Sequence, residues 1–180
     1  MRWLKLVSEI GLLLVACAPR LPELDEISKL QRDLRVLLEK QGAQSSLFMS
    51  TALELARKEE AFAKKYPNHA EVPRLLIEAA EIYGTYFGDA SRAVGILRQV
   101  DERFRHRSSL APKALFYEAF LYETALQDTA KARERYEDFL RFYPDHELAK
   151  DARRSIETLG KPPEQLIQEI LKGRLTLPPQ

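Results

Sequence analysis

The chain has 180 residues, with 28 Lys and Arg against 27 Asp and Glu, and a formal net charge of +1 at pH 7. This length supports one domain with its own core, and the balanced charge and 45% hydrophobic content exclude a polyionic, disordered chain. Because Cys17 is the only cysteine, an intramolecular disulfide and a cysteine-ligated zinc site are also excluded. Leu and Ala are much commoner than Val and Ile, which predicts an all-α fold.

The first residues have the pattern of a secretion signal. Arg2 and Lys5 give a positive start, and residues 10–16 form an apolar run that is too short to span a hydrocarbon core of about 30 Å. The run ends in Leu14-Val15-Ala16-Cys17, which resembles the bacterial lipobox, whose cysteine is acylated and becomes the mature N-terminus. We therefore expect a lipoprotein signal peptide over residues 1–16 and a lipidated tether over residues 17–22.

The lipobox resemblance implies a covalent lipid on Cys17 and no other cofactor. Ala18 follows the cysteine instead of Asp, which in enteric-type sorting implies the outer membrane facing the periplasm, with the inner membrane as the alternative. Cleavage would remove two basic residues and one acidic residue, so the mature chain would have no net charge, which argues against nucleic acid as a partner. The alternative is an uncleaved anchor, or a buried N-terminal helix whose cysteine has no role.

Two helices are predicted before the central part of the chain. Leu24, Ile27, Leu34 and Leu37 recur at helical spacing, and Gly42 ends this separate amphipathic helix. A second helix is predicted over residues 50–65, ending at Tyr66-Pro67. It looks like the second helix of an incomplete repeat.

The centre of the chain contains two similar units, residues 73–111 and 112–150. Each is predicted to be an antiparallel helical hairpin, because apolar residues recur at helical spacing on both sides of a loop at Asp89 or Asp128. The predicted core positions are Leu76, Ala80, Tyr83, Ala93, Leu97 and Val100 in the first unit, and Leu115, Ala119, Tyr122, Ala132, Tyr136 and Phe139 in the second.

These units resemble the tetratricopeptide repeat, in which a small residue and an aromatic residue in the first helix are followed by Ala, an aromatic residue and Pro in the second. Ala119, Tyr122, Ala132, Tyr136 and Pro144 match this pattern in the second unit, whereas the first unit departs from it in its second helix. The resemblance implies an α-solenoid of antiparallel helical hairpins with flanking amphipathic helices over residues 23–172.

The turns between the helices resemble those of one subgroup of tetratricopeptide proteins. Tyr66-Pro67-Asn68-His69 and Tyr143-Pro144-Asp145-His146 are similar to the turns of periplasmic tetratricopeptide proteins. That group includes the outer-membrane-protein assembly lipoprotein BamD and the Tol-Pal-associated cell-division coordinator. The resemblance implies a scaffold for protein–protein interaction in outer-membrane protein assembly or envelope maintenance.

The chain is predicted to end in two shorter helices and a flexible tail. Leu148, Ala152, Ile156 and Leu159 form one apolar stripe that Gly160 ends, and a short helix follows Pro163. These helices are expected to cap the stack of repeats, and residues 173–180 are expected to fray.

The resemblance also implies a concave groove that holds a protein or peptide partner. The candidate groove residues are Arg74, Ile77 and Glu81 from the first unit, and Lys113, Phe116 and Phe120 from the second. Phe116 and Phe120 lie one turn apart on a face distinct from the predicted core stripe, and exposed phenylalanines are typical of a contact surface. Alternatively, the helix around Leu24 or the helix around Leu166 covers both rings within the chain.

No catalytic or metal-binding residues are predicted. His69, His106 and His146 fall in separate turns, too far apart to share one zinc ion, and no phosphate-binding glycine loop or His-Glu-x-x-His motif is present. A cell-wall-active enzyme with a dispersed carboxylate site, or an accessory to one, remains the alternative. A basic cluster at residues 103–107 is expected to complement a helix C-terminus, and an anionic lipid or partner site is its alternative.

Overall fold

The computed structural model describes residues 21–172 and confirms the all-α prediction, since these residues contain helices and no strand. The helices are α2 (Pro22–Gln41), α3 (Ser46–Lys65), α4 (Val72–Tyr86), α5 (Ala90–Phe104), α6 (Ala111–Thr124), α7 (Thr129–Phe142), α8 (Ala149–Thr158) and α9 (Pro163–Leu171). The predicted signal peptide, Cys17 and the predicted tail lie outside the described residues.

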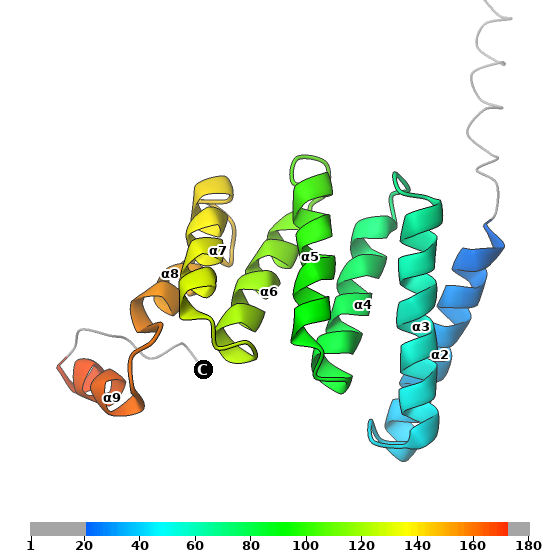
Figure 1. Ribbon diagram of the computed structural model, residues 1–180, viewed down its shortest axis with the longest axis horizontal. Helices are drawn as coiled ribbons and strands as arrows, with labels where there is room; N and C mark the ends of the chain where they lie inside the picture. The colour runs from blue at the N-terminus through cyan, green and yellow to red at the C-terminus, as the bar shows by residue number, and fades with distance from the viewer. Residues whose placement is uncertain (1–20, 173–180) are drawn as a thin grey trace, which may run out of the picture.

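Helices α2 to α7 stand side by side in chain order, each antiparallel to the one before it (Figure 1). Each helix from α2 to α7 packs against the next, and α4 also touches α6. Helices α3, α5 and α7 form one layer, while α2, α4 and α6 lie behind it (Figure 1). The chain therefore has two long faces, and each turn between helices lies at one of two opposite edges.

The core between these layers is built from the residues at helical spacing. All twelve core positions predicted for the two units are buried, with at most 5% of any side chain exposed. Pro73 and Pro112 begin α4 and α6, where the missing backbone N–H costs no hydrogen bond. Asp89 and Asp128 cap α5 and α7, because each carboxylate accepts a hydrogen bond of 3.0 Å from the backbone N–H three residues later.

The two Tyr-Pro-x-His turns have the same internal structure. The Nδ1 atoms of His69 and His146 each accept a hydrogen bond of 3.2 Å from the backbone N–H two residues later. Their rings stand edge-on against Phe62 and Phe139, with centroids 5.2 and 5.6 Å apart. Both histidines thus hold the chain as it leaves one helix and enters the next.

The N-terminal region differs from its prediction as a lone helix followed by half a repeat. α3 begins at Ser46, four residues earlier than predicted, because Ser45 caps it and Phe48 and Ala52 extend its buried stripe. α2 packs along α3 through the buried side chain of Ile27. The two helices therefore form a complete hairpin in front of the two similar units.

The C-terminal helices are less well covered. Ala149 and Ala152 bury α8 against α7, whereas Ile167 and Leu171 of α9 remain exposed. None of the helices in residues 21–172 is long and apolar enough to cross a membrane.

Candidate partner groove

The face formed by α2, α4 and α6 carries two adjoining hollows. The first lies between α2 and α4 and has a volume of about 380 Å³, and the second lies between α4 and α6 with about 270 Å³. The lining of the first is Gln31, Leu34, Arg35, Leu38, Phe48, Arg74, Glu78 and Tyr86, and that of the second is Arg74, Ile77, Glu78, Glu81, Leu110 and Lys113. Since both hollows share Arg74 and Glu78, they form one groove across three helices, which we call the α2–α4–α6 groove.

Charged side chains line the walls of this groove. Arg74 binds Glu71 at 2.7 Å and Glu78 at 3.1 Å, both within α4 or directly before it. Lys113 of α6 binds Glu81 of α4 at 3.0 Å, which ties the two walls of the second hollow together. These side chains are about half exposed, so each pair contributes little to stability and can exchange its partner for a ligand group at low cost.

The floor of the groove is apolar. Ile77 is only 4% exposed and lies beneath the charged pairs, while Leu34 and Leu110 are half-buried. Leu38, 42% exposed, extends this apolar surface at the α2 end. Apolar floor and charged walls together suit a polypeptide segment that presents both apolar and ionic side chains.

Four of the predicted groove residues meet in the second hollow, namely Arg74, Ile77, Glu81 and Lys113. Phe116 and Phe120 do not line it. The ring of Phe116 packs edge-on against Tyr136 at 5.5 Å and Phe139 at 5.6 Å, both on α7. Phe120 stacks on Tyr117 at 6.4 Å and remains 43% exposed.

The different position of Phe116 follows from the packing of α6 between two neighbours. α6 contacts α5 on one side and α7 on the other, so it buries two faces instead of one. Leu115 and Ala119 fill the face predicted as core, and Phe116 belongs to the second buried face. Apolar spacing within one helix reveals the first face only.

A buried carboxyl group lies directly beneath the groove. The side-chain N–H groups of Gln31 donate to Glu59 at 3.2 Å and to Glu78 at 2.7 Å, which links α2, α3 and α4. Glu59 is completely buried, and burial raises its pKa to about 10, with a further contribution from the negative charge of Glu78. Glu59 therefore keeps its proton at neutral pH.

Sequence reasoning did not single out Glu59, although a signal was present. It lies four residues after Leu55 and four before Ala63, both of which are buried on the same face of α3. Glu118 is a similar case, since it is buried on α6 and its carboxylate accepts a hydrogen bond from Arg98 at 3.2 Å. Burial raises the pKa of Glu118, and the positive charges of Arg135 and Arg98 oppose that shift.

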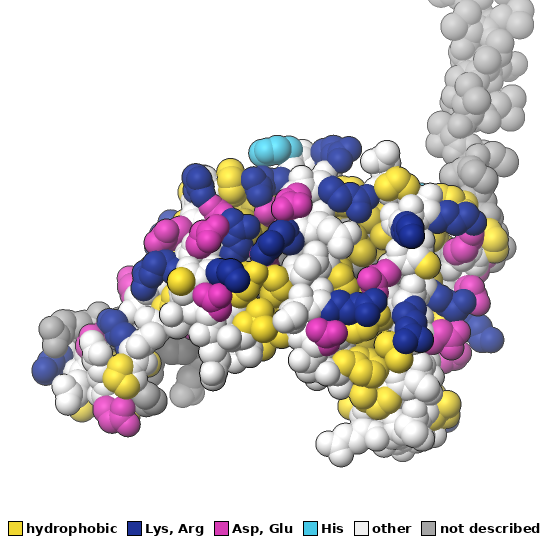
Figure 2. All heavy atoms as spheres, viewed as in Figure 1, with side chains coloured by type: hydrophobic (Ala, Val, Ile, Leu, Met, Phe, Trp, Pro, Cys, Tyr) yellow, Lys and Arg dark blue, Asp and Glu magenta, His cyan; other side chains and the backbone are white. Residues whose placement is uncertain are grey.

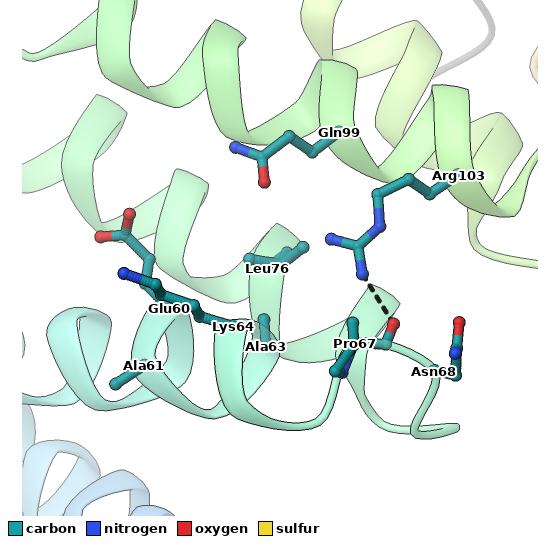
Figure 3. A pocket seen from close by; sticks show the side chains of 9 residues that line it. All are labelled: Glu60, Ala61, Ala63, Lys64, Pro67, Asn68, Leu76, Gln99 and Arg103. Carbon is teal, nitrogen blue, oxygen red and sulfur yellow. Dashed lines mark hydrogen bonds between the residues drawn. The ribbon is translucent and has the colours of Figure 1, made fainter.

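The opposite face, formed by α3, α5 and α7, mixes basic and acidic side chains (Figure 2). It holds a hollow of about 590 Å³ between α3 and α5, into which Gln99 and Arg103 project from α5 (Figure 3). Glu60 lines the same hollow, but Arg92 at 2.8 Å and the Tyr83 hydroxyl at 2.9 Å already occupy its carboxylate. The lining of this hollow is mixed. Glu60, Lys64, Asn68, Gln99 and Arg103 are polar or charged, and Ala61, Ala63, Pro67 and Leu76 are apolar.

Within residues 21–172, no three side chains of His, Cys, Asp or Glu lie close enough together to hold a metal ion. The other buried carboxylates are held by arginines in separate places, Asp101 by Arg105 and Asp138 by Arg135 and Arg141. They do not converge on the groove.

Neither a protein-family model, nor a curated protein, nor a solved structure matches this chain. The assignment of a function therefore depends on the geometry of the α2–α4–α6 groove and on the sequence patterns themselves.

Proposed function

We propose that this chain is a lipid-anchored, non-catalytic scaffold for protein–protein interaction in the bacterial cell envelope. In this proposal the body is a tetratricopeptide-like α-solenoid, and the α2–α4–α6 groove holds a protein or peptide partner. The observation that carries the proposal is the continuity of the groove, in which Arg74 and Glu78 join two hollows across three helices.

The packing order supports the solenoid. From α2 to α7 each helix packs against the next helix in the chain, as in repeat proteins whose units contact only adjacent units. The equivalent turns at His69 and His146 and the equivalent caps at Asp89 and Asp128 further support a repeated hairpin.

The anchor is proposed from Cys17 and the apolar run before it. A single acyl chain binds a membrane only marginally, whereas two or more chains hold a protein stably. We place the scaffold on the outer membrane facing the periplasm, with the inner membrane as the alternative. Outer-membrane protein assembly or envelope maintenance is the proposed setting.

The mechanism follows from tethering. A scaffold confined to a membrane surface meets other envelope proteins at a raised effective concentration, so a modest groove affinity is sufficient. Within the groove, Arg74 would bind carboxylates of the partner, Glu81 would bind its cations, and the floor at Ile77 would take its apolar side chains.

Site-specific cross-linking in bacteria tests this proposal. A photoreactive amino acid in place of Arg35 or Lys113 would lie in the groove, and one in place of Arg57 or Gln99 would lie on the opposite layer as a matched control. We expect both groove positions to cross-link to the same envelope protein and the control positions not to. Arg74→Glu should weaken this cross-link, because it places a third acid beside Glu71 and Glu78. Equal cross-linking from both faces would contradict the proposal.

The alternative is an envelope enzyme or an accessory to one, and one observation favours it. Two carboxyl groups, Glu59 and Glu78, meet through Gln31 beside the α2–α4 hollow. Glu59 is buried and cannot touch a substrate, and Arg74 binds Glu78, so we prefer the scaffold. If Glu78→Gln abolished hydrolysis of cell-wall material while leaving the groove cross-link intact, the enzyme would be the better account.

A further inference from the structure

One edge of the molecule brings together the beginning of α2 and three turns. The hydroxyl of Tyr66 at the end of α3 donates to Glu23 in the first turn of α2 at 3.1 Å. Arg103 at the end of α5 donates to the carbonyl oxygen of Pro67 in the α3–α4 turn at 2.6 Å. The Tyr143 hydroxyl after α7 donates to the carbonyl oxygen of Arg105 at 3.3 Å. These contacts run along the upper edge in Figure 1.

Three cations on this edge lack a carboxylate partner among the described residues, namely Lys64, Arg103 and Arg107, which we call the basic edge. Arg107 donates to the carbonyl oxygen of Arg103 at 2.6 Å, and both guanidinium groups lie over the ring of Phe104, at 5.5 and 5.1 Å. Neutral groups therefore fix the direction of the two arginines without cancelling their charge. Lys64 lines the same hollow as Arg103, from the side on which Glu60 lies (Figure 3).

Other cations of the same edge are neutralised. Lys65 is paired with Glu23, and Arg105 is paired with the buried Asp101. The basic edge thus places three cations without an ion pair among the described residues where the helices α3 and α5 end.

The length of chain before α2 links this edge to the proposed anchor. Cys17 precedes Leu21 by four residues, which span at most about 14 Å when fully extended. By contrast, the 20 residues of α3 place the opposite edge about 30 Å away. An acylated Cys17 would therefore hold the edge that carries Lys64, Arg103 and Arg107 near the membrane.

We propose that the basic edge lies against an anionic phospholipid surface. In this orientation the helix axes are roughly perpendicular to the membrane surface, and the α2–α4–α6 groove opens parallel to that surface. This inference rests on the proposed lipid anchor. The position of the chain end favours a lipid surface over an acidic protein, since the tether brings the membrane to this edge. Each such cation near an anionic membrane strengthens the contact about fivefold, so all three together contribute about a hundredfold.

Energy transfer on vesicles tests the orientation. In the acylated protein an introduced cysteine would be the only free thiol. A fluorophore on Ser109→Cys would report the α5–α6 turn at the basic edge, and one on Gln44→Cys would report the α2–α3 turn at the opposite edge. On vesicles of phosphatidylglycerol and phosphatidylethanolamine with a headgroup acceptor, we expect strong transfer from position 109 and weak transfer from position 44.

The charge dependence separates orientation from simple tethering. Pure phosphatidylcholine vesicles, or about 1 M NaCl with a Debye length of about 3 Å, should reduce the difference between the two positions. The triple variant Lys64→Gln, Arg103→Gln, Arg107→Gln should do the same and lower the oriented-to-unoriented ratio about a hundredfold. The triple variant Lys40→Gln, Arg57→Gln, Arg133→Gln makes the same charge change away from the edge and should have no such effect.

Three results would overturn the inference. Equal energy transfer from positions 109 and 44 in vesicle-bound protein would show an anchor without orientation. A difference between the two positions that is the same on anionic and neutral vesicles would show that the charge of the basic edge does not orient the protein. Loss of an acidic protein partner in the first triple variant, with lipid transfer unchanged, would assign the edge to that protein. Failure of the wild-type protein to float with vesicles at all would instead refute the anchor in the proposed function, and the orientation with it.

Discussion

Phe116 and Phe120 lie one turn apart on α6 in opposite surroundings, and their truncation tests the packing of α6. Phe116→Ala removes a half-buried ring from between Tyr136 and Phe139 of α7. Phe120→Ala removes a ring that is 43% exposed and touches Tyr117 alone among the aromatic residues described. We expect the first substitution to destabilise the fold strongly and the second to have little effect.

The geometry sets the magnitudes. Truncation of a buried Phe costs about 3–5 kcal/mol, and each edge-to-face ring pair contributes about 0.5–1.5 kcal/mol. Phe116 is only partly buried but forms two such pairs, so Phe116→Ala should lower the free energy of unfolding by about 3 kcal/mol. For Phe120→Ala the loss should be less than about 1 kcal/mol.

Urea denaturation followed by circular dichroism measures this difference directly. A gap of about 2 kcal/mol shifts the unfolding midpoint by about 1 M urea for a slope of about 2 kcal/mol per M. The slopes themselves should agree between the variants. Equal losses from both substitutions, or a larger loss from Phe120→Ala, would show that the rings do not face α7 and solvent as described.

Two further stability predictions concern buried charge and capping. Burial raises the pKa of Glu59 to about 10, above its ordinary value of 4.5, so the folded chain holds a proton that the unfolded chain releases and stability should fall between these pH values. Glu59→Gln keeps the hydrogen bond from Gln31 and should raise the free energy of unfolding at pH 8 more than at pH 5. An effect that does not depend on pH would contradict the claim that Glu59 is protonated in the folded chain. Asp89→Ala removes the cap of α5 and should cost about 1 kcal/mol in the same assay, whereas Asp89→Asn should cost less; equal costs would show that side-chain capping is unimportant there.

Local patterns in the sequence were sufficient to predict the helical hairpins of the two similar units. The i, i+4, i+7 spacing of Leu76, Ala80 and Tyr83 identifies one buried face of α4, and the loop at Asp89 separates α4 from α5. Proline positions and aspartate caps agree with the same boundaries. These features depend on neighbours within one or two turns, which a single sequence displays directly.

The groove was only partly predictable, because it depends on how separate helices meet. Arg74, Ile77, Glu81 and Lys113 come together because α4 and α6 lie side by side in the layer behind α5. Phe116 lies outside it because α6 is buried on two faces. The contribution of α2 to the groove, through Gln31 and Leu34, requires the α2–α3 hairpin that sequence spacing left as two unrelated helices.

The buried acids show a second limit. Glu59 and Glu118 occupy positions on apolar faces, where spacing alone predicts a hydrophobic residue. Only the partners, Gln31 for Glu59 and Arg98 for Glu118, explain why a carboxyl group is tolerated, and both partners come from other helices. Such long-range pairing has no local signature in one chain.

The most direct test of the scaffold on a lipid tether is the intact mass of the protein extracted from bacterial membranes. We predict that residues 1–16 are absent and that the new N-terminal Cys17 carries acyl chains. For the Cys17→Ser variant we predict no acylated protein in the membrane fraction. A mass equal to the full 180 residues, or an unmodified cysteine in membrane-bound protein, would contradict the account.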